Sequence, residues 1–313
     1  MIFNKNKIYS INFIALLLIL SSISKCNNPF IKNHDLPYAI KSPSAKYVLE
    51  HKLNEVSGLS FVSEKEVALI EDENGSIFYY DFITKKITRT ILFAKDGDFE
   101  DLQVINDTVY IIKSDGTLFE LKNFKGPKYG IVKCKYYTGL TKKNNAEGLC
   151  YDDKKKLLLI ACKGKAGKID SDEKYKNKKA IYSYNPETKV LSDTPVVLID
   201  ESEVRKHAYS IRKNAIENII KFYTRTQEKS DFEPSGLAIQ PITRDIYVIS
   251  TVGKILVILE PDGKLKHVEK LAPNIFKQPE GIAFDSVGNM YISNEGRKGE
   301  GNILKFLYAK DNL

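Results

Sequence analysis

The sequence predicts an all-β fold, a single β-propeller of five blades, and three observations support this. A short motif recurs five times. In each copy, a glutamate shortly precedes a Gly or Asp, called the slot below, at which an apolar strand begins. The slots are 43, 47, 88 and 45 residues apart, at Gly58, Asp101, Gly148, Gly236 and Gly281. Each repeat also contains short alternating apolar runs bounded by turn residues, which is typical of half-buried strands. Repeats of this length with several strands each are typical of propellers.

The first two repeats each predict a four-stranded blade. Pairs such as Asn-Gly, Asn-Asp and Asp-Gly separate the apolar runs and favour tight turns. The predicted strands of the first blade are 58–62, 66–70, 76–82 and 87–93. Those of the second blade are 102–105, 108–113, 117–121 and 130–137.

The third repeat carries two insertions, which account for the longest gap between slots. Its predicted strands are 148–151, 157–162, 180–184 and 196–199, and the first insertion, 164–179, is a charged loop. The second insertion, 200–227, predicts a helix because apolar residues recur three or four apart, at Val204, Ala208, Ile211, Ala215, Ile219 and Phe222. We expect this helix to pack on the flank of the propeller; the alternative is a helix on a membrane surface. Six blades would require a degenerate blade here, where the pattern is helical.

The last two repeats complete the ring. The fourth blade has predicted strands 237–240, 245–250, 255–260 and 266–270. The fifth has only three of its own, at 282–284, 290–292 and 301–308, and then the chain ends. An isolated strand at 47–53 precedes the first repeat. We therefore expect the N-terminal strand to close the fifth blade.

The N-terminal residues predict export rather than a folded segment. Residues 1–26 have a basic start, an apolar run and Cys26, the pattern of a signal peptide with a lipidated cysteine. Lys25 stands where a small residue is usual, so an export signal without lipidation is the alternative. Residues 27–45 predict a tether and 46–313 the propeller domain. The expected location is the bacterial cell envelope, as a lipoprotein anchored in the outer membrane or facing the periplasm.

Composition argues against nucleic-acid binding and against a disulfide framework. The net charge falls from +8 to +5 without the first 25 residues, because they carry three lysines and no acid. Only six basic residues are Arg, and the lysines are scattered rather than gathered on one face. The three cysteines after Cys26 are Cys134, Cys150 and Cys162. Because Cys150 and Cys162 lie in apolar strands, we expect them to be buried core residues.

Every repeat has a glutamate at the entry to its innermost strand, and these strands line the channel of a propeller. The glutamates are Glu55, Glu100, Glu147, Glu233 and Glu280. Carboxylates around one axis repel one another unless they are protonated, hydrated or neutralised by a cation. Ca²⁺ takes six to eight hard oxygen ligands, and the four histidines do not cluster as zinc ligands would. The sequence therefore predicts a Ca²⁺ site in the channel; the alternative is that each glutamate caps backbone amides.

The first strand of a blade starts on the face where the second strand ends, so polar residues after the second strands should surround the same mouth. The expected ligand-binding residues are Glu71, Asp72, Lys113, Lys163, Asn294 and Glu295. Both insertions leave from this face and could cover it. Such a concave polar mouth is a default binding site. No G-x-S-x-G motif or serine with evident His and acid partners is present, so we predict no catalytic residue.

Four ordered segments carry a resemblance to a known family. They are GDFEDLQVINDTVYIIKSDGTLFEL (97–121), NAEGLCYDDKKKLLLIACKG (145–164), FEPSGLAIQPITRDIYVIS (232–250) and QPEGIAFDSVGNMYISNEG (278–296). The combination resembles the SdiA-regulated (YjiK-like) family of exported bacterial β-propellers. The resemblance implies an envelope protein with a cation site on Glu100, Glu147 and Glu280, with Glu55 and Glu233 nearby. It assigns no activity.

The sequence thus favours a binding protein over an enzyme. We expect a monomer, anchored to the membrane by lipid, whose channel holds Ca²⁺ and whose mouth recognises a small molecule, a glycan or a protein. One alternative is a Ca²⁺-dependent esterase or lactonase, in which the ion would polarise a carbonyl and Glu71 or Glu295 would handle protons. This alternative rests on analogy of fold. The other is a scaffold with an inert channel.

Overall fold

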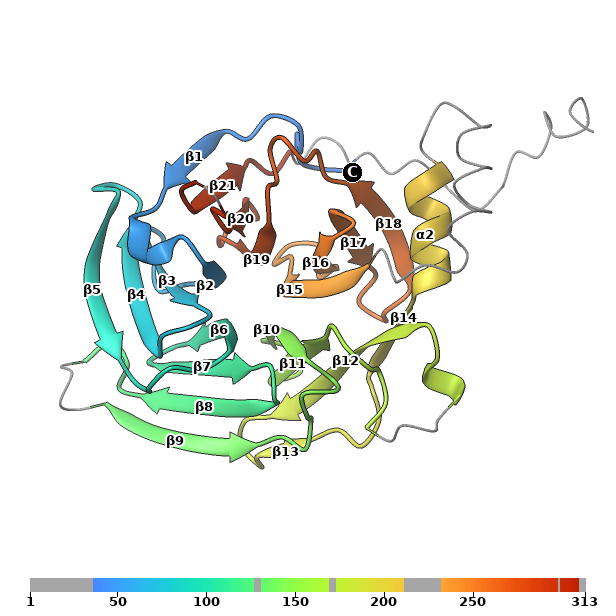
Figure 1. Ribbon diagram of the computed structural model, residues 1–313, viewed down its shortest axis with the longest axis horizontal. Coiled ribbons are helices and arrows are strands. Elements are labelled where there is room, and N and C mark those ends of the chain that lie inside the picture. Colours follow the sequence, from blue (N-terminus) through green and yellow to red (C-terminus); the bar gives the residue numbers. More distant parts are fainter. Residues whose placement is uncertain (1–35, 127–130, 169–172, 211–231, 298, 310–313) are drawn as a thin grey trace, which may run out of the picture. The chain divides into compact units, whose positions relative to one another are not determined.

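Five antiparallel sheets form a single five-bladed β-propeller, as the sequence predicted (Figure 1). The computed structural model describes residues 36–126, 131–168, 173–210, 232–297 and 299–309. The predicted signal peptide and Cys26 lie outside these ranges. Within them, no helix combines the length and apolar character needed to cross a membrane.

Each of the first two blades has four strands in sequence order. The first blade contains β2 (Val56–Phe61), β3 (Glu66–Glu71), β4 (Ser76–Asp81) and β5 (Lys86–Leu92). The second contains β6 (Phe99–Ile105), β7 (Thr108–Lys113), β8 (Thr117–Lys122) and β9 (Val132–Tyr137). The innermost strands begin earlier than predicted. Glu100 therefore lies inside β6, whereas Glu55 immediately precedes β2.

The third blade differs from the others in its outer part. It consists of β10 (Ala146–Asp152), β11 (Leu157–Cys162), β12 (Lys178–Asn185), β13 (Val190–Leu191) and β14 (Val197–Asp200). Both β13 and β14 pair with β12, so two short strands replace the single outer strand that was predicted. Cys150 and Cys162 are buried and free, which confirms their predicted place in the core.

The predicted helical insertion begins with α2 (Glu201–Ser210), and its remainder, residues 211–227, lies outside the described ranges. Asp200 precedes the helix, and its carboxylate accepts hydrogen bonds from the Ser202 and Glu203 amides. Val204 and Ala208 are fully buried against the core between the third and fourth blades. The described part of the helix therefore packs on the flank of the propeller, beside β18 (Leu265–Lys270) (Figure 1).

The last two blades close the ring. The fourth blade contains β15 (Glu233–Ile239), β16 (Ile246–Val252), β17 (Ile255–Leu259) and β18. The fifth contains β19 (Pro279–Phe284), β20 (Met290–Asn294) and β21 (Asn302–Phe306), and β1 (Ala45–Val48) pairs antiparallel with β21 on its outer side. The N-terminal strand is thus shifted from the predicted 47–53, because His51–Leu53 form a 3₁₀ turn, η2.

The core lies between the blades rather than within any one of them. Five apolar clusters each combine residues of two neighbouring blades, including the first with the fifth. Tyr38 and Ile40, in the predicted tether, are buried in the cluster between the fourth and fifth blades. The Tyr38 hydroxyl also donates a hydrogen bond to the Gly288 carbonyl at 2.7 Å. This part of the predicted tether is therefore packed on the propeller.

Candidate functional site

The same irregularity occurs in all five innermost strands. The register between first and second strands is interrupted at each slot: between Val56 and Leu59, and at the corresponding places in β6, β10, β15 and β19. A β-bulge of this kind bends the strand and re-aims one side chain. The residues immediately before the slots are Ser57, Glu100, Glu147, Ser235 and Glu280. Three carboxylates and two hydroxyls therefore occupy equivalent bulge positions around the channel.

The slot itself is where neighbouring innermost strands come closest. A Cβ added at Gly236 would lie 2.4 Å from the Glu280 carbonyl oxygen, and one at Gly58 would meet the Asp101 side chain. Asp101 is the one non-glycine slot, and its carboxylate bridges two blades. It accepts hydrogen bonds from the Leu102 amide at 2.8 Å and the Leu149 amide at 2.7 Å. Burial raises the pKa of Asp101 well above its usual value, and the two amide bonds oppose that shift.

Glu100, Glu147 and Glu280 lie close enough to influence one another, and Lys163 lies among them. Lys163 Nζ is 3.0 Å from Glu147 Oε1, and Asn145 donates to the same oxygen at 2.7 Å. Glu147 is only 4% exposed. Within this group, called the channel cluster below, three carboxylates face one ammonium.

Burial and the excess of carboxylates over ammonium groups raise the pKa values of the channel cluster. Burial, and then the charge of Glu147, raises the pKa of Glu100 to about 10. The same two causes raise the pKa of Glu280 to about 8, against the opposing effect of Lys163. Burial also raises the pKa of Glu147, while Lys163 opposes that shift. Burial alone would lower the pKa of Lys163, but Glu147 outweighs it and the pKa is raised. The cluster therefore retains protons that isolated carboxylates would release.

The structure does not bring Glu55 and Glu233 to the level of the other three glutamates. Both lie three residues before their slots, where the other blades carry Asp98, Asn145 and Gln278. Glu55 is exposed and Glu233 partly exposed. These five residues form a second, more open tier. Counting back from the slot rather than seeking glutamates would have revealed both tiers in the sequence.

Of the six predicted ligand-binding residues, three are buried or held by contacts of their own, and the other three lie near the glutamates. Glu71 accepts hydrogen bonds from the Glu73 and Asn74 amides, and Asn294 is completely buried. Lys113 lies over the Phe99 ring and 3.9 Å from Asp115. Asp72, Lys163 and Glu295 instead follow the second strands by one residue and lie near the glutamates. Ser114 follows β7 in the same way and its hydroxyl bonds to Asp98, whereas Thr251 lies near the end of β16 and donates to the Pro279 carbonyl.

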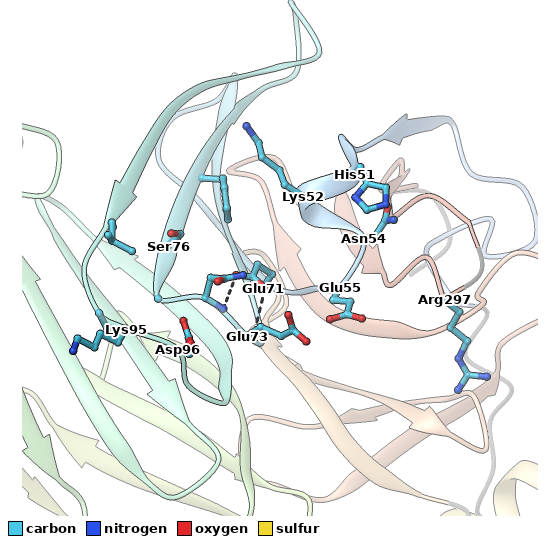
Figure 2. A pocket seen from close by; sticks show the side chains of 15 residues that line it. His51, Lys52, Asn54, Glu55, Glu71, Glu73, Ser76, Lys95, Asp96 and Arg297 are labelled. Atoms are coloured by element: carbon cyan, nitrogen blue, oxygen red, sulfur yellow. Dashed lines mark hydrogen bonds between the residues drawn. The ribbon is translucent and has the colours of Figure 1, made fainter.

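A groove of about 830 Å³ opens beside the first blade on this face (Figure 2). Its lining mixes acids with bases: Glu55, Glu71, Glu73 and Asp96 with His51, Lys52, Lys95 and Arg297. Near it, burial and then the charges of Glu55 and Glu71 raise the pKa of Asp72 to about 7. Asp72 Oδ1 is buried without a hydrogen-bond partner among the described atoms. On the side of the first blade, the mouth thus combines acidic and basic side chains.

The opposite end of the channel has no charged side chain in the lining of its cavity. A cavity of about 160 Å³ is lined there by the ends of all five innermost strands, with Phe61, Tyr151 and Phe284 among the larger side chains. Gln103 crosses between blades: it accepts from the Tyr151 amide at 3.2 Å and donates to Ser60 Oγ at 3.2 Å. Of the two cavities described at the ends of the channel, the one on the side of the glutamates therefore carries the charged side chains.

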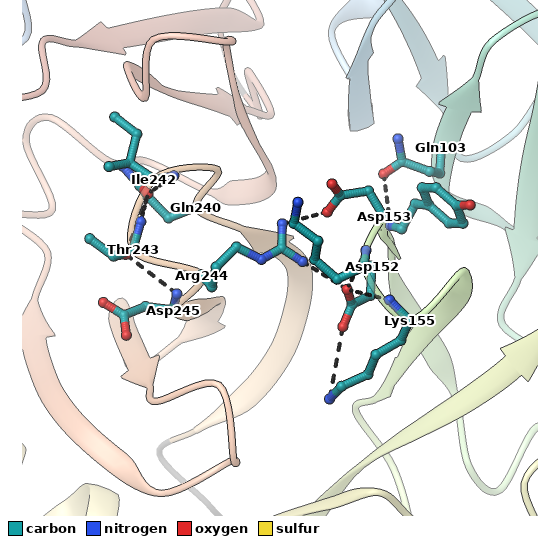
Figure 3. Close-up of polar contacts among 11 residues, drawn as sticks. Gln103, Asp152, Asp153, Lys155, Gln240, Ile242, Thr243, Arg244 and Asp245 are labelled. Atoms are coloured by element: carbon teal, nitrogen blue, oxygen red, sulfur yellow. Dashed lines mark hydrogen bonds and ion pairs between the residues drawn. The ribbon is translucent and has the colours of Figure 1, made fainter.

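At the ends of the strands away from the glutamates, Arg244 joins the fourth blade to the third (Figure 3). Its guanidinium lies 2.7 Å from Asp152 and 2.5 Å from Asp153. Asp152 is 8% exposed in its side chain, whereas Lys155, which contacts it at 3.8 Å, is 63% exposed. The pair with Arg244 is thus shielded from water, and the pair with Lys155 is not.

Replacing Arg244 with glutamine should lower the free energy of unfolding by about 2 kcal/mol, because it leaves a buried carboxylate without its charged partner. Glutamine keeps the Cβ, so the positive φ of 66° costs the same in both proteins. The matched control is Lys155→Gln, expected to change stability by less than about 0.5 kcal/mol. Urea denaturation measures both. Equal losses in the two variants would contradict the importance of the inter-blade pair.

The donor atoms of the channel cluster suit a hard cation. They are carboxylate oxygens, and neither histidine nor cysteine is among them. In the described ranges, however, no group of three or more His, Cys, Asp or Glu side chains is placed to hold a metal ion. The glutamates therefore supply the type of oxygen ligand that Ca²⁺ prefers, but they do not form a complete coordination shell. An ion at the channel cluster would take its remaining ligands from water.

Comparisons with known proteins support the family and the fold. A model of the family described as SdiA-regulated matches residues 38–297. The comparison with curated proteins gives no match. Glutaminyl cyclase of Myxococcus xanthus is similar in structure, with a TM-score of 0.53, 11% identity, and coverage of 85% of this chain and 95% of that chain. Aldose sugar dehydrogenase of Streptomyces coelicolor gives a TM-score of 0.49, 10% identity, and coverage of 85% and 97%. At 11% identity, the likeness to the glutaminyl cyclase shows the fold alone.

Proposed function

The chain belongs to the SdiA-regulated family, and we propose that it is a binding protein that holds a divalent cation, Ca²⁺, at the channel cluster. In this proposal Cys26 anchors the protein to the bacterial envelope, and the mouth presents the ion to a ligand. The observation that carries the proposal is the gathering of three carboxylates, those of the buried Glu147 and of the partly buried Glu100 and Glu280, around one ammonium.

The charge and the position of the three carboxylates favour their neutralisation by a cation over neutralisation by protons alone. A buried carboxylate without a partner is costly, and opposite charge within a few ångströms favours its ionised form. The five bulges hold Glu100, Glu147 and Glu280 at equivalent places on rigid strands, so the negative charges cannot separate. Once Glu100 and Glu280 lose their protons, a divalent ion would offset the two negative charges that Lys163 leaves uncompensated.

The residues of the cluster have separate roles in this proposal. Glu147 and Glu280 supply oxygens, and Glu100 supplies a further oxygen once its proton is lost. Ser57 and Ser235, at the other bulge positions, do not supply charge: Ser235 Oγ donates to the Pro279 carbonyl at 2.9 Å. Lys163 reduces the net negative charge of the channel cluster when no ion is bound. The bound ion would supply positive charge at the mouth for an anionic or polar group of the ligand.

Titration calorimetry with Ca²⁺ tests the proposal. The double variant Glu147→Gln/Glu280→Gln should weaken binding by about a hundredfold, because two ligand charges are removed. The matched control replaces two exposed glutamates, Glu64→Gln/Glu187→Gln, and should leave the affinity unchanged. Equal affinity in the wild type and the double variant would exclude the channel cluster as the site.

A further inference from the structure

Four large apolar side chains lie exposed on the face opposite the mouth. The first and third strands of each blade run away from the glutamates, and each of the four residues follows such a strand: β4, β15, β19 or β21. This face, formed by the turns after first and third strands, is called the base below. The four residues, called the base patch, are Ile83, Ile242, Val287 and Leu307, with exposed fractions of 70%, 49%, 64% and 57%.

Three residues of the base patch lie around Gly288. A Cβ added at Gly288 would lie 3.0 Å from Ile242 Cδ1 and 3.3 Å from Tyr308 Cγ. Val287 adjoins Gly288 in the sequence, and Leu307 adjoins Tyr308. The base therefore gathers exposed aliphatic side chains from the fourth and fifth blades. Single apolar residues scattered over a surface are ordinary, but a gathered set marks an interaction surface.

The turns that carry the base patch are held by the same local contact. In three of them, the side chain two positions earlier accepts a hydrogen bond from the amide of the exposed apolar residue. These contacts join Asp81 to Ile83 at 3.0 Å, Gln240 to Ile242 at 2.6 Å and Asp285 to Val287 at 3.2 Å. Because such contacts fix the backbone of the turn, presenting the aliphatic side chains costs little further conformational entropy.

The described chain begins beside the base patch. The Pro37 carbonyl accepts a hydrogen bond from the Ala309 amide at 2.9 Å, and the Tyr38 hydroxyl bonds to the turn between β19 and β20. Cys26 precedes Leu36 by ten residues, and ten extended residues span at most about 35 Å. Anchoring at Cys26, which is part of the proposed function, would therefore hold the base near a lipid bilayer.

The tether alone does not decide which face meets the bilayer, because its reach exceeds the length of an innermost strand. β15, for example, has seven residues and spans about 23 Å. The two faces differ in chemistry, however. The groove at the mouth is lined by charged side chains such as Glu55, Glu73 and Asp96, which are costly to bring into lipid. Exposed aliphatic side chains instead gain free energy at the boundary between headgroups and acyl chains.

We propose that the base is a membrane-binding surface, whose four aliphatic side chains enter the headgroup boundary of a lipid bilayer. The mouth then points away from the membrane and presents the channel cluster to ligands in solution. The contact itself depends on the base patch, whereas the tether, which rests on the proposed function, keeps the base close to the bilayer. Exposed residues of both signs, such as Glu64 and Lys65, adjoin each other on the base, so the contact does not require anionic lipid.

Tryptophan fluorescence tests this orientation, because the sequence contains no tryptophan. The full chain with Val287→Trp is reconstituted in vesicles of phosphatidylethanolamine and phosphatidylglycerol that carry brominated acyl chains. The emission should shift to shorter wavelength, and bromine should quench about half of it or more. Asn74→Trp, in the exposed turn between β3 and β4 at the mouth, is the matched reporter and should show neither effect.

Removal of the apolar side chains gives a second test. With Leu307→Trp as the reporter, Ile242→Ser/Val287→Ser should reduce quenching by about threefold or more, because two aliphatic groups leave the bilayer contact. The control, Val132→Ser/Val190→Ser, removes aliphatic side chains of similar exposure, 51% and 60%, from outer strands and should leave quenching unchanged. Circular dichroism checks that each variant is folded.

Flotation of the vesicles and the mass of the purified chain report anchoring at Cys26 separately. A lipidated chain that floats while position 287 stays unquenched would overturn the membrane-binding surface and leave the proposed function standing. Quenching at position 287 in an unlipidated chain would support the surface without the anchor, and a chain that neither floats nor is quenched would overturn both. Equal quenching at positions 74 and 287, or equal effects of the two double variants, would also overturn the surface. So would a wavelength shift without quenching, which is expected where a second copy of the chain covers the base patch.

Discussion

Raising the pH from about 5 to about 9 in the presence of a chelator is expected to lower the free energy of unfolding of the wild type by about 3 kcal/mol or more. Glu100, whose pKa is about 10, and Glu280 both contribute to this loss. The pKa of Glu280 is about 8 in the folded protein, well above its ordinary value of 4.5. The folded state therefore holds a proton that the unfolded state releases. The stabilisation is complete below about pH 4.5 and is lost as the pH rises through about 8.

Urea denaturation at several pH values measures this effect. Glu280→Gln should remove part of the pH dependence, leaving that of Glu100, and should be more stable than the wild type at about pH 9. The control Glu64→Gln, an exposed carboxylate, should follow the wild-type curve. Added Ca²⁺ should restore the stability of the wild type at high pH, because an ion that binds only the folded state stabilises it. An equal loss of stability in Glu280→Gln and wild type would show that the channel cluster does not carry the charge excess.

Gly236→Ala is expected to lower the free energy of unfolding by about 3 kcal/mol. The new Cβ would lie 2.4 Å from the Glu280 carbonyl oxygen and 3.1 Å from Gly281 Cα, so two innermost strands would have to separate. Backbone atoms cannot move aside as a flexible side chain does. The same separation would displace Glu280, so Ca²⁺ affinity should fall together with stability.

Gly299→Ala is the matched control, because its nearest neighbours would be 3.5 Å from the new Cβ. Its stability should stay within about 0.5 kcal/mol of the wild type. Thermal unfolding and Ca²⁺ calorimetry on both variants give the comparison. A stable Gly236→Ala protein with unchanged Ca²⁺ affinity would show that the strands around the channel are less closely packed than described.

The fold was largely predictable because its signal is repeated. Five slots at related spacings specify five blades, and alternation within each repeat specifies the strands. The predictions were less accurate where the fold depends on contacts between distant segments. The split outer edge of the third blade follows from pairing of β13 and β14 with the same strand, and no local pattern encodes that.

The candidate site was predictable in part, for a different physical reason. A search for repeated glutamates found Glu100, Glu147 and Glu280 but gave the same weight to Glu55 and Glu233. Glu55 and Glu233 lie two positions farther from the slot than the other three glutamates. They therefore lie before the bulge, in the more open tier, and not at it. The bulge appears in the register of the strands, not in their composition. Lys163 was predicted as a ligand-binding residue, but its ion pair with Glu147 depends on the pairing of β10 with β11.

Anomalous diffraction from crystals grown with Ca²⁺ tests the central claim most directly. The proposal predicts a peak on the channel axis, within 2.3–2.6 Å of carboxylate oxygens of Glu147 and Glu280, the usual range for calcium. Lys163 should then lie farther from Glu147 than the present 3.0 Å. A map with no peak at the channel cluster, with Lys163 still paired to Glu147, would contradict it.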